Sequence, residues 1–208
     1  MRSRSSQRWL QRHVTDPFVR RARESGRRSR AAFKLLEIDQ RERLLRPGAR
    51  VVDLGAAPGG WSQVAAERVR PGGVVVAVDL LEIAPISGVT VLRGDFRDAA
   101  VQAAVAEALG GSKADVVLSD LSPNLSGIAS ADQARAAELI HAAIEFCGRC
   151  LAPPGAFLAK VFQGEEFGGV LAALRTSFRE VRTRKPGASR DESRETYLLA
   201  RGLKSPPA

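Results

Sequence analysis

The sequence predicts an α/β protein with one mostly parallel sheet of seven strands, helices on both faces and a single antiparallel strand. Short apolar runs alternate with longer segments of helical periodicity along most of the 208 residues. The last two runs are separated only by a loop, which predicts a hairpin and therefore one reversed strand. Several runs end in a charged residue, as expected where parallel strands meet a ligand at their carboxyl ends.

The predicted elements follow one another in a regular order. Ser29 caps a helix with an apolar stripe between Ala32 and Ile38, and Arg46-Pro47-Gly48 ends that helix. Further helices are expected from a glycine-rich loop to Val69, and at 97–109, 131–150 and 166–177. Strands are expected at 50–54, 74–78, 89–92, 115–119, 156–161, 180–184 and 195–201, with the turn Pro153-Pro154-Gly155 before the fifth.

The chain divides into a basic, flexible or partly helical arm at 1–29, broken by Asp16-Pro17, a single globular domain at 30–204 and a frayed tail at 205–208. The formal charge of +9 is unevenly distributed. Residues 1–30 hold ten arginines against two acidic residues, and 175–204 hold nine basic residues against four acidic ones. Two basic ends around a mildly acidic middle favour RNA or DNA binding over a merely solvated basic surface.

No targeting or membrane segment is evident. No apolar run approaches the roughly 20 residues that span a bilayer, so no membrane association is expected. The N-terminal arginines are not followed by an apolar stretch, which argues against a secretory signal. Arginine and serine there are also typical of mitochondrial presequences, but the missing apolar face favours a functional arm in a cytoplasmic protein. No exposed apolar stripe stands out, which favours a monomer.

The two cysteines, Cys147 and Cys150, lie one helical turn apart. No second cysteine pair accompanies them, and His13 and His141 do not have zinc-finger spacing. Reduced, structural thiols are therefore expected, without a metal site.

The glycine-rich loop at 53–61 follows the first strand. Gly55, Gly59 and Gly60 allow a tight turn and close approach of a ligand to the backbone. The loop lacks both the G-x-G-x-x-G pattern and a following G-K-[ST], which disfavours dinucleotides and nucleoside triphosphates. A neutral loop suits the methionine part of S-adenosylmethionine, while an ordinary strand–helix turn is the alternative.

Two aspartates follow the next strands. Asp79 can accept hydrogen bonds from both ribose hydroxyls of an adenosine. Asp95 lies where an acid can bind the adenine amine, with Phe96 flanking the ring. A loop or cap aspartate is the alternative interpretation for each.

Four charged residues lie near the ends of predicted elements: Lys34, Asp120, Lys160 and Glu195. A lysine at the end of a buried strand is unfavourable unless paired, and partial burial favours the neutral amine that a general base needs. Asp120 and Glu195 would orient Lys160, and Lys34 would stabilise a developing alkoxide or position the target ribose. A buried salt-bridge cluster is the structural alternative.

Five motifs in this order resemble those of the FtsJ/RrmJ family, whose members methylate a uridine ribose 2′-oxygen in large-subunit ribosomal RNA. The motifs are 29–35 (SRAAFKL), 51–62 (VVDLGAAPGGWS), 119–127 (SDLSPNLSG), 160–164 (KVFQG) and 193–197 (SRETY). The resemblance covers essentially the whole chain. One departure is Ser122, where the bacterial members are expected to have alanine.

The resemblance implies a Rossmann-like, S-adenosylmethionine-dependent methyltransferase fold. It also implies a catalytic tetrad of Lys34, Asp120, Lys160 and Glu195, with Lys160 as the general base. Cofactor contacts are expected at Gly55, Pro58, Gly59, Trp61, Asp79, Asp95, Phe96 and Asp120. The expected partner is 23S ribosomal RNA of the large (50S) subunit, bound through the basic N- and C-terminal regions, with the assembled subunit favoured over free RNA.

Alternatives remain for the substrate and for the activity. The same tetrad serves transfer RNA or messenger-RNA caps, and a catalytically silent RNA-binding assembly factor is a further alternative. A dinucleotide oxidoreductase is disfavoured by the loop sequence. Trp9 and Phe18 of the arm either stack on exposed bases or pack against the domain, and packing is favoured for both.

Overall fold

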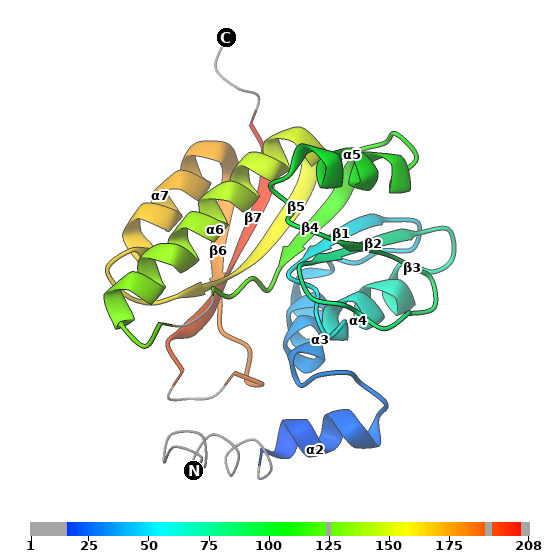
Figure 1. The fold of residues 1–208 in the computed structure, drawn as a ribbon, viewed down its shortest axis with the longest axis horizontal. Coiled ribbons are helices and arrows are strands. Elements are labelled where there is room, and N and C mark those ends of the chain that lie inside the picture. Colours follow the sequence, from blue (N-terminus) through cyan, green and yellow to red (C-terminus); the bar gives the residue numbers. More distant parts are fainter. Residues whose placement is uncertain (1–15, 124–125, 190–192, 205–208) are drawn as a thin grey trace.

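The computed structural model describes residues 16–123, 126–189 and 193–204, which form a sheet flanked by helices (Figure 1). The described helices are α2 (Pro17–Glu24), α3 (Ala31–Glu42), α4 (Gly60–Arg68), α5 (Ala99–Ala108), α6 (Ala129–Cys150) and α7 (Phe167–Ser177). The strands are β1 (Arg50–Leu54), β2 (Val74–Asp79), β3 (Val89–Arg93), β4 (Ala114–Ser119), β5 (Leu151–Phe162), β6 (Phe178–Arg184) and β7 (Glu195–Leu203).

The sheet has the strand order β3-β2-β1-β4-β5-β7-β6. β7 pairs antiparallel with both β5 and β6, whereas the other pairings are parallel. The predicted single reversed strand is therefore confirmed. The chain order reverses between β1 and β4, and this switch point is where ligands bind in such sheets.

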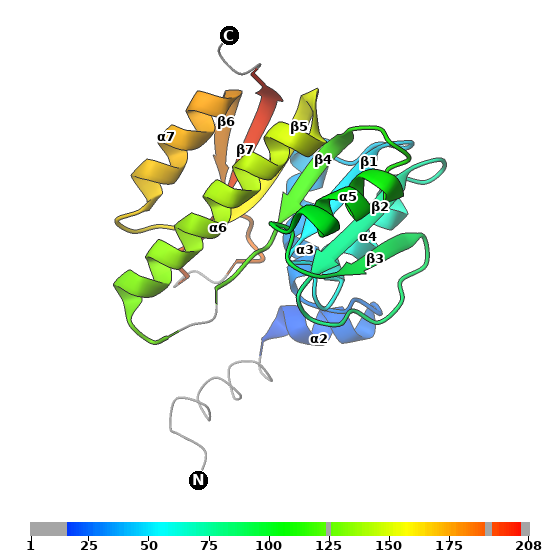
Figure 2. The ribbon, with the colours of Figure 1, turned by 45° about the horizontal axis from the view of Figure 1, so that its top comes forward.

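Helices cover both faces of the sheet (Figure 2). The first face packs against α3 and α4 through buried side chains that include Leu35, Ile38 and Val64. The second packs against α5, α6 and α7, where Phe146 and Leu174 are among the buried residues. The two helix layers cover the faces of the sheet but not the carboxyl ends of its parallel strands. The charged side chains of the predicted site lie at that edge.

Two predicted helix boundaries differ from the structure. Asp16-Pro17 was expected to break the arm, but it begins α2, because the Asp16 side chain accepts a 3.0 Å hydrogen bond from the Phe18 backbone and Pro17 starts the helix. The next helix begins at Ala31 without a side-chain cap rather than at Ser29, and it ends at Glu42 because Arg43 takes a left-handed conformation with φ 52°.

The predicted turn at Pro153-Pro154-Gly155 is wrong. These residues lie inside β5, next to a register shift opposite Ala114 and Val116 on β4. Proline donates no ladder hydrogen bond, so it is tolerated at such an irregularity in a strand. In the part of the chain that the structure describes, no helix is long and apolar enough to span a membrane.

Candidate active site

The predicted strand-end residues converge at the switch point between β1 and β4. A cavity of about 440 Å³ lies there, lined among others by Gly55, Asp79, Asp95, Asp120 and Ser122. A second cavity, of about 130 Å³, lies on the other side of Gly55 and Asp120 and reaches the loop that begins α4. Asp120 lines both cavities, and the Lys160 ammonium lies 3.0 Å from its carboxylate, so Asp120 joins the cavities to the lysine.

The glycine-rich loop is shaped by positions where a side chain does not fit. Gly55 has φ 73°, and a Cβ there would lie 2.9 Å from a Leu121 side-chain carbon. Gly59 has φ 103° and ends the loop at the start of α4, with Ile86 and Arg28 packed against its Cα. Glycine is needed at both positions, because the left-handed backbone and the close packing of Leu121, Ile86 and Arg28 leave no room for a side chain.

Asp79 is held in place by the loop. Its Oδ2 accepts a 2.8 Å hydrogen bond from the Ala57 backbone, and its Oδ1 accepts one of 2.8 Å from the Leu81 backbone. Each carboxylate oxygen has a second lone pair, so Asp79 keeps acceptor capacity for ribose hydroxyls.

Asp95 and Phe96 both line the larger cavity, but their side chains have different partners. Asp95 is paired with Arg97, whose Nε lies 2.9 Å from Oδ1, and hydrogen bonding from Arg97 lowers the pKa of the Asp95 carboxyl. The ring of Phe96 is buried and meets the Phe146 ring edge-on. Phe96 thus packs into the core beneath the cavity that it lines.

Pro58 and Trp61 hold the loop against neighbouring elements. The Pro58 carbonyl accepts a 3.3 Å hydrogen bond from Arg28. The Trp61 ring is buried beside Tyr197, and its indole N–H donates a 2.8 Å bond to the carbonyl of Ala31. The indole N–H is therefore already engaged inside the protein.

Asp53 is a further site residue, to which the sequence analysis assigns no role. It is fully buried at the end of β1, its Oδ2 accepts a 2.6 Å bond from Ser62, and its Oδ1 has no hydrogen-bond partner among the described residues. Burial raises the pKa of Asp53 to about 7, the nearby charges of Asp120 and Asp79 add to the rise, and the Ser62 hydrogen bond opposes it. The apolar run before Asp53 predicts the end of a strand. Nothing in the sequence indicates that one oxygen of the Asp53 carboxyl is buried without a hydrogen-bond partner.

Lys160 is held by the end of β4. Its Nζ lies 3.0 Å from the Asp120 backbone oxygen, 3.0 Å from Asp120 Oδ1 and 2.7 Å from Ser122 Oγ. The side chain is 8% exposed. Alternation along β5 places Lys160 on the same face as Leu158, toward α3.

Lys34 and Glu195 form a second ion pair beside the first. The Lys34 ammonium contacts Oε1 of Glu195, which also accepts a 2.9 Å hydrogen bond from the Tyr197 hydroxyl. Burial alone would raise the pKa of the Glu195 carboxyl. The charge and hydrogen bond of Lys34, the hydrogen bond from Tyr197 and the charge of Lys160 together outweigh the effect of burial, so the pKa is lowered.

The β5–β7 register brings the two pairs together. Lys160 lies opposite Tyr197, and Phe162 lies opposite Glu195. Glu195 was expected to orient Lys160 together with Asp120. Glu195 instead contacts Lys34 directly. Lys160 affects the pKa of Glu195 only through its charge.

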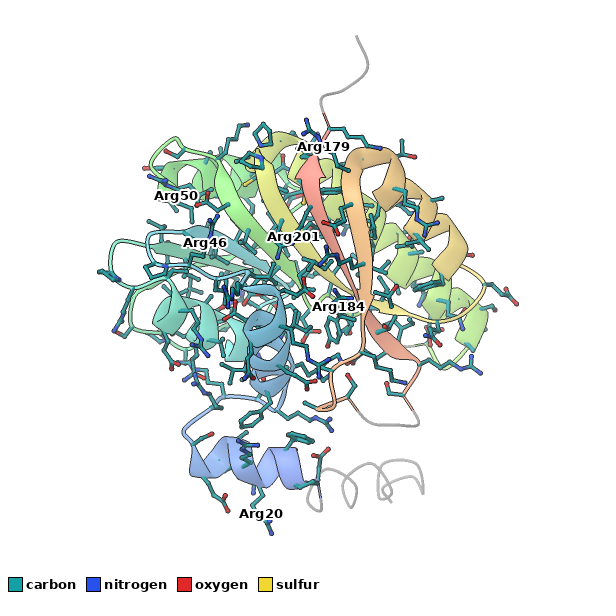
Figure 3. The ribbon with its side chains drawn as sticks, turned by 180° about the vertical axis from the view of Figure 1, so that it is seen from behind. Arg20, Arg46, Arg50, Arg179, Arg184 and Arg201 are labelled. Atoms are coloured by element: carbon teal, nitrogen blue, oxygen red, sulfur yellow. The ribbon has the colours of Figure 1, made fainter. Side chains whose placement is uncertain are left out.

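Part of the basic arm is fastened to the domain. Arg27 forms a two-bond pair with Glu67, and Arg30 binds Asp16 and the Ala188 carbonyl. These arginines are engaged within the protein, whereas Arg20 projects from α2 away from the sheet (Figure 3). Within the described part of the arm, Arg27 is therefore tied to the domain, whereas Arg20 faces outward and pairs with Glu24 on the same helix.

The aromatic and thiol predictions have different outcomes. The Phe18 ring lies 5.9 Å from the half-buried Phe33 ring on α3, and whether Phe18 also stacks on a base stays a prediction. Trp9 lies outside the described residues. Cys147 and Cys150 are unpaired, and burial raises the pKa of both thiols, as expected for structural cysteines.

Basic side chains from the C-terminal region gather around one glutamate. Glu42 at the end of α3 lies within ion-pair distance of Arg182, Arg184 and Arg201. Figure 3 shows Arg184 and Arg201 on the side of the sheet that carries α3. Arg182 also pairs with Glu180, so the cluster joins three guanidinium groups to two carboxylates.

Comparisons with known proteins agree with this arrangement. Residues 27–203 match the model of the family described as FtsJ-like methyltransferase. Among curated relatives, the chain is 52% identical over 200 residues to "Ribosomal RNA large subunit methyltransferase E" of Methylobacillus flagellatus, with 96% of each chain covered. It is 51% identical over 203 residues to the protein of that name from Pseudomonas aeruginosa, with 98% of each covered.

A solved structure shares the fold. A ribosomal RNA methyltransferase from Plasmodium falciparum superposes with a TM-score of 0.77 at 28% identity, covering 85% of this chain and 98% of that one. The family match spans the glycine-rich loop, both ion pairs and the reversed strand. The chain belongs to the FtsJ-like methyltransferase family.

Proposed function

We propose that this protein transfers a methyl group from S-adenosylmethionine to the 2′-oxygen of a uridine ribose in 23S ribosomal RNA of the large subunit. The observation that carries the proposal is the position of Lys160, a nearly buried amine fixed by Asp120, which itself lines both cavities beside the glycine-rich loop. A base and a cofactor loop at one point suit proton removal coupled to group transfer.

The cavities fit S-adenosylmethionine. Gly55 lines both cavities, and Gly59 sets the turn of the loop that begins α4. Asp79 and Asp95 offer carboxylates along the larger cavity, and Asp53 offers a buried, unpartnered oxygen to an ammonium group in the smaller one. Pro58 supplies loop backbone, Trp61 packs against Tyr197 at the start of α4, and Phe96 lines the larger cavity. When bound, the cofactor supplies an electrophilic sulfonium methyl group.

The two ion pairs have separate roles in the proposed reaction. Lys160, as the neutral amine, takes the proton of the ribose hydroxyl while Asp120 holds it in position. Lys34 presents an ammonium whose orientation is fixed by Glu195, and it stabilises negative charge on the ribose oxygen or an adjacent phosphate. Proximity and orientation supply much of the rate acceleration.

Several observations support the substrate. The curated relatives are named for the large-subunit ribosomal RNA that they methylate. Basic residues outnumber acidic ones in both terminal regions of the sequence, and Arg20 faces outward from α2, which supplies positive charge for a phosphate backbone. We propose a cytoplasmic monomer that takes its specificity from the folded RNA surface of the subunit.

Transfer of labelled methyl from S-adenosylmethionine tests the proposal. Unmodified large subunits, protein-free ribosomal RNA and transfer RNA serve as parallel substrates. Alkali-resistant label in the subunit RNA is the expected result, because a methylated 2′-oxygen blocks cleavage of the next phosphodiester. Label only in transfer RNA would overturn the substrate, and no label despite cofactor binding would favour a binding-only role.

A further inference from the structure

We propose that Arg30 is a positioning residue, which joins the N-terminal arm to the loop between β6 and β7 and holds that loop beside the Lys34–Glu195 pair. The inference rests on the proposed function, because it assumes that Lys34 acts on the ribose oxygen or an adjacent phosphate. Arg30 directly precedes α3, and its side chain is 16% exposed. Its two terminal nitrogens donate to segments that lie far apart in the sequence, Asp16 of the arm and Ala188 of the loop.

One face of α3 carries the charged groups that meet this loop and β7. Arg30, Lys34 and Glu37 follow one another at helical spacing, so their side chains lie on the same side of the helix. Glu37 accepts a 3.3 Å hydrogen bond from the Ala188 N–H, and Arg30 donates to the Ala188 carbonyl. Lys34, between them, contacts Glu195. Ala188 is therefore held by the residues on either side of Lys34.

The loop leads from Ala188 directly to the Lys34–Glu195 pair. Ala188 and Ser189 are buried, and Ser189 Oγ lies 3.5 Å from Oε1 of Glu195. The same oxygen contacts Lys34 and accepts the hydrogen bond of Tyr197. Because Ser189 follows Ala188 in the chain, a displacement of Ala188 would move Ser189 and change the surroundings of this oxygen.

Arg30 also connects the two basic ends of the sequence. Asp16 caps α2 of the arm, and Ala188 lies in the basic region at 175–204. The Asp16 and Arg30 side chains are mostly buried, so solvent screens their ion pair little. The Arg30 Nε has no hydrogen-bond partner among the described residues, so the orientation of the guanidinium follows from its terminal nitrogens. RNA that binds both basic ends is thereby held in a fixed position relative to Lys34.

Turnover at saturating subunits and cofactor tests the proposal with Arg30→Ala and Arg30→Lys. Arg30→Ala is expected to lower turnover about 10–100-fold, because a small misplacement of a group at the reacting centre has an effect of that size. Arg30→Lys keeps the charge but has one nitrogen, which is expected to stay with Asp16 and release Ala188, so its turnover should fall as well. Arg27→Ala is the matched control, since it removes an arginine from the neighbouring segment and breaks a pair with Glu67 that does not involve the loop.

The single tyrosine of the chain provides a readout other than activity. With carbon-13 at the tyrosine Cζ, the protein has one labelled resonance, and its chemical shift depends on the hydrogen bond from Tyr197 to Glu195. Measured without cofactor or RNA, this resonance is expected to move in Arg30→Ala and Arg30→Lys and to stay in place in Arg27→Ala.

Two outcomes of this measurement would overturn the proposal. One is an unchanged resonance in Arg30→Ala. The other is a resonance that moves in Arg30→Ala but not in Arg30→Lys, which would show that the charge of Arg30 acts without the bridge. If Arg30→Ala does not fold, Arg30→Lys decides alone, and an unchanged resonance or a turnover equal to that of Arg27→Ala overturns the proposal.

Failure of the proposed function is recognised separately. A parent protein that transfers no methyl group to subunits contradicts the proposed function, whereas the tyrosine resonance still decides whether Arg30 holds the loop in place. If the parent protein is active and both Arg30 variants turn over as fast as Arg27→Ala, the positioning role is wrong and the proposed function stands.

Discussion

The phenol of Tyr197 donates a 2.9 Å hydrogen bond to Oε1 of Glu195, the oxygen that also contacts the Lys34 ammonium. Tyr197 is fully buried and lies opposite Lys160 across the β5–β7 ladder. Burial raises the pKa of the phenol, and the charges of Asp120 and Glu195 raise it further, so the hydroxyl stays a proton donor. Tyr197 thus forms a direct link to the Lys34–Glu195 pair and lies on the strand next to Lys160.

Replacing Tyr197 by phenylalanine tests this link. The change removes one hydrogen bond to a buried charged group, so the free energy of unfolding should fall by about 1.5–3 kcal/mol in urea titrations. Thr176→Ala, on an exposed face of α7, should stay within about 0.5 kcal/mol of the parent protein. A Tyr197→Phe protein as stable as its parent would show that the bond contributes nothing to stability.

Asp53 predicts a pH dependence of stability. Its pKa is raised by burial from 3.8 to about 7, so its stabilising contribution is complete below pH 3.8 and is lost as the pH rises through 7. Asp53→Asn cannot ionise, so its stability relative to the parent should increase by about 1–3 kcal/mol between pH 5 and pH 8. Denaturant titrations of both proteins at the two pH values measure this change. A difference in the free energy of unfolding that is the same at pH 5 and pH 8 would contradict the raised pKa.

The sheet was predictable because its signals are local. Apolar runs such as that before Asp53 and the hairpin before Glu195 determine strand number and the reversed strand. The boundaries of α3 were missed because they depend on the cap at Arg30 and the left-handed Arg43 rather than on periodicity. The prolines of β5 predict a turn, because the register shift that accommodates them is not visible in one strand's sequence.

The members of the site were predictable, but their pairing was not. Sequence places Lys34, Lys160, Asp120 and Glu195 near element ends, yet which lysine contacts which carboxylate depends on the β5–β7 register. The buried orientation of the Trp61 ring likewise follows from tertiary packing against Tyr197. Roles in binding and catalysis stay predictions for all of these residues.

Lys160 and Asp79 should separate turnover from cofactor binding. Lys160→Ala should lower the rate of methyl transfer by about 10²–10⁴-fold, because it removes the general base, and should leave the dissociation constant for S-adenosylmethionine unchanged. Asp79→Ala should instead weaken cofactor binding measured by calorimetry. Near-normal turnover of Lys160→Ala would remove Lys160 as the base, and tight binding by Asp79→Ala would remove Asp79 from the cofactor site.

Gly59 should tolerate no side chain. Gly59→Ala introduces about 1–2 kcal/mol of left-handed backbone strain and places a Cβ 2.5 Å from Ile86 Cδ1. Both stability and S-adenosylmethionine affinity should therefore fall. Gly168→Ala on α7, where a Cβ meets nothing within 4 Å, should instead stabilise the protein by about 0.5–1 kcal/mol. Equal effects of the two substitutions would contradict a special conformation at Gly59.

Arg28 should act on cofactor affinity through the loops that it joins. Its guanidinium donates to the carbonyls of Pro58, Ala84 and Pro85, at 3.3, 2.6 and 2.6 Å, and so fastens the glycine-rich loop to the segment between β2 and β3.

Arg28→Ala should weaken S-adenosylmethionine binding about tenfold, equivalent to ~1.4 kcal/mol, because the ligand must then order both loops. Arg27→Ala removes an arginine from the same segment but breaks only the pair with the half-exposed Glu67, so it should change cofactor affinity little. Calorimetric titration of both variants distinguishes a local clamp from general loss of arm charge. If the two variants lose affinity equally, net charge rather than loop anchoring explains the role of the segment.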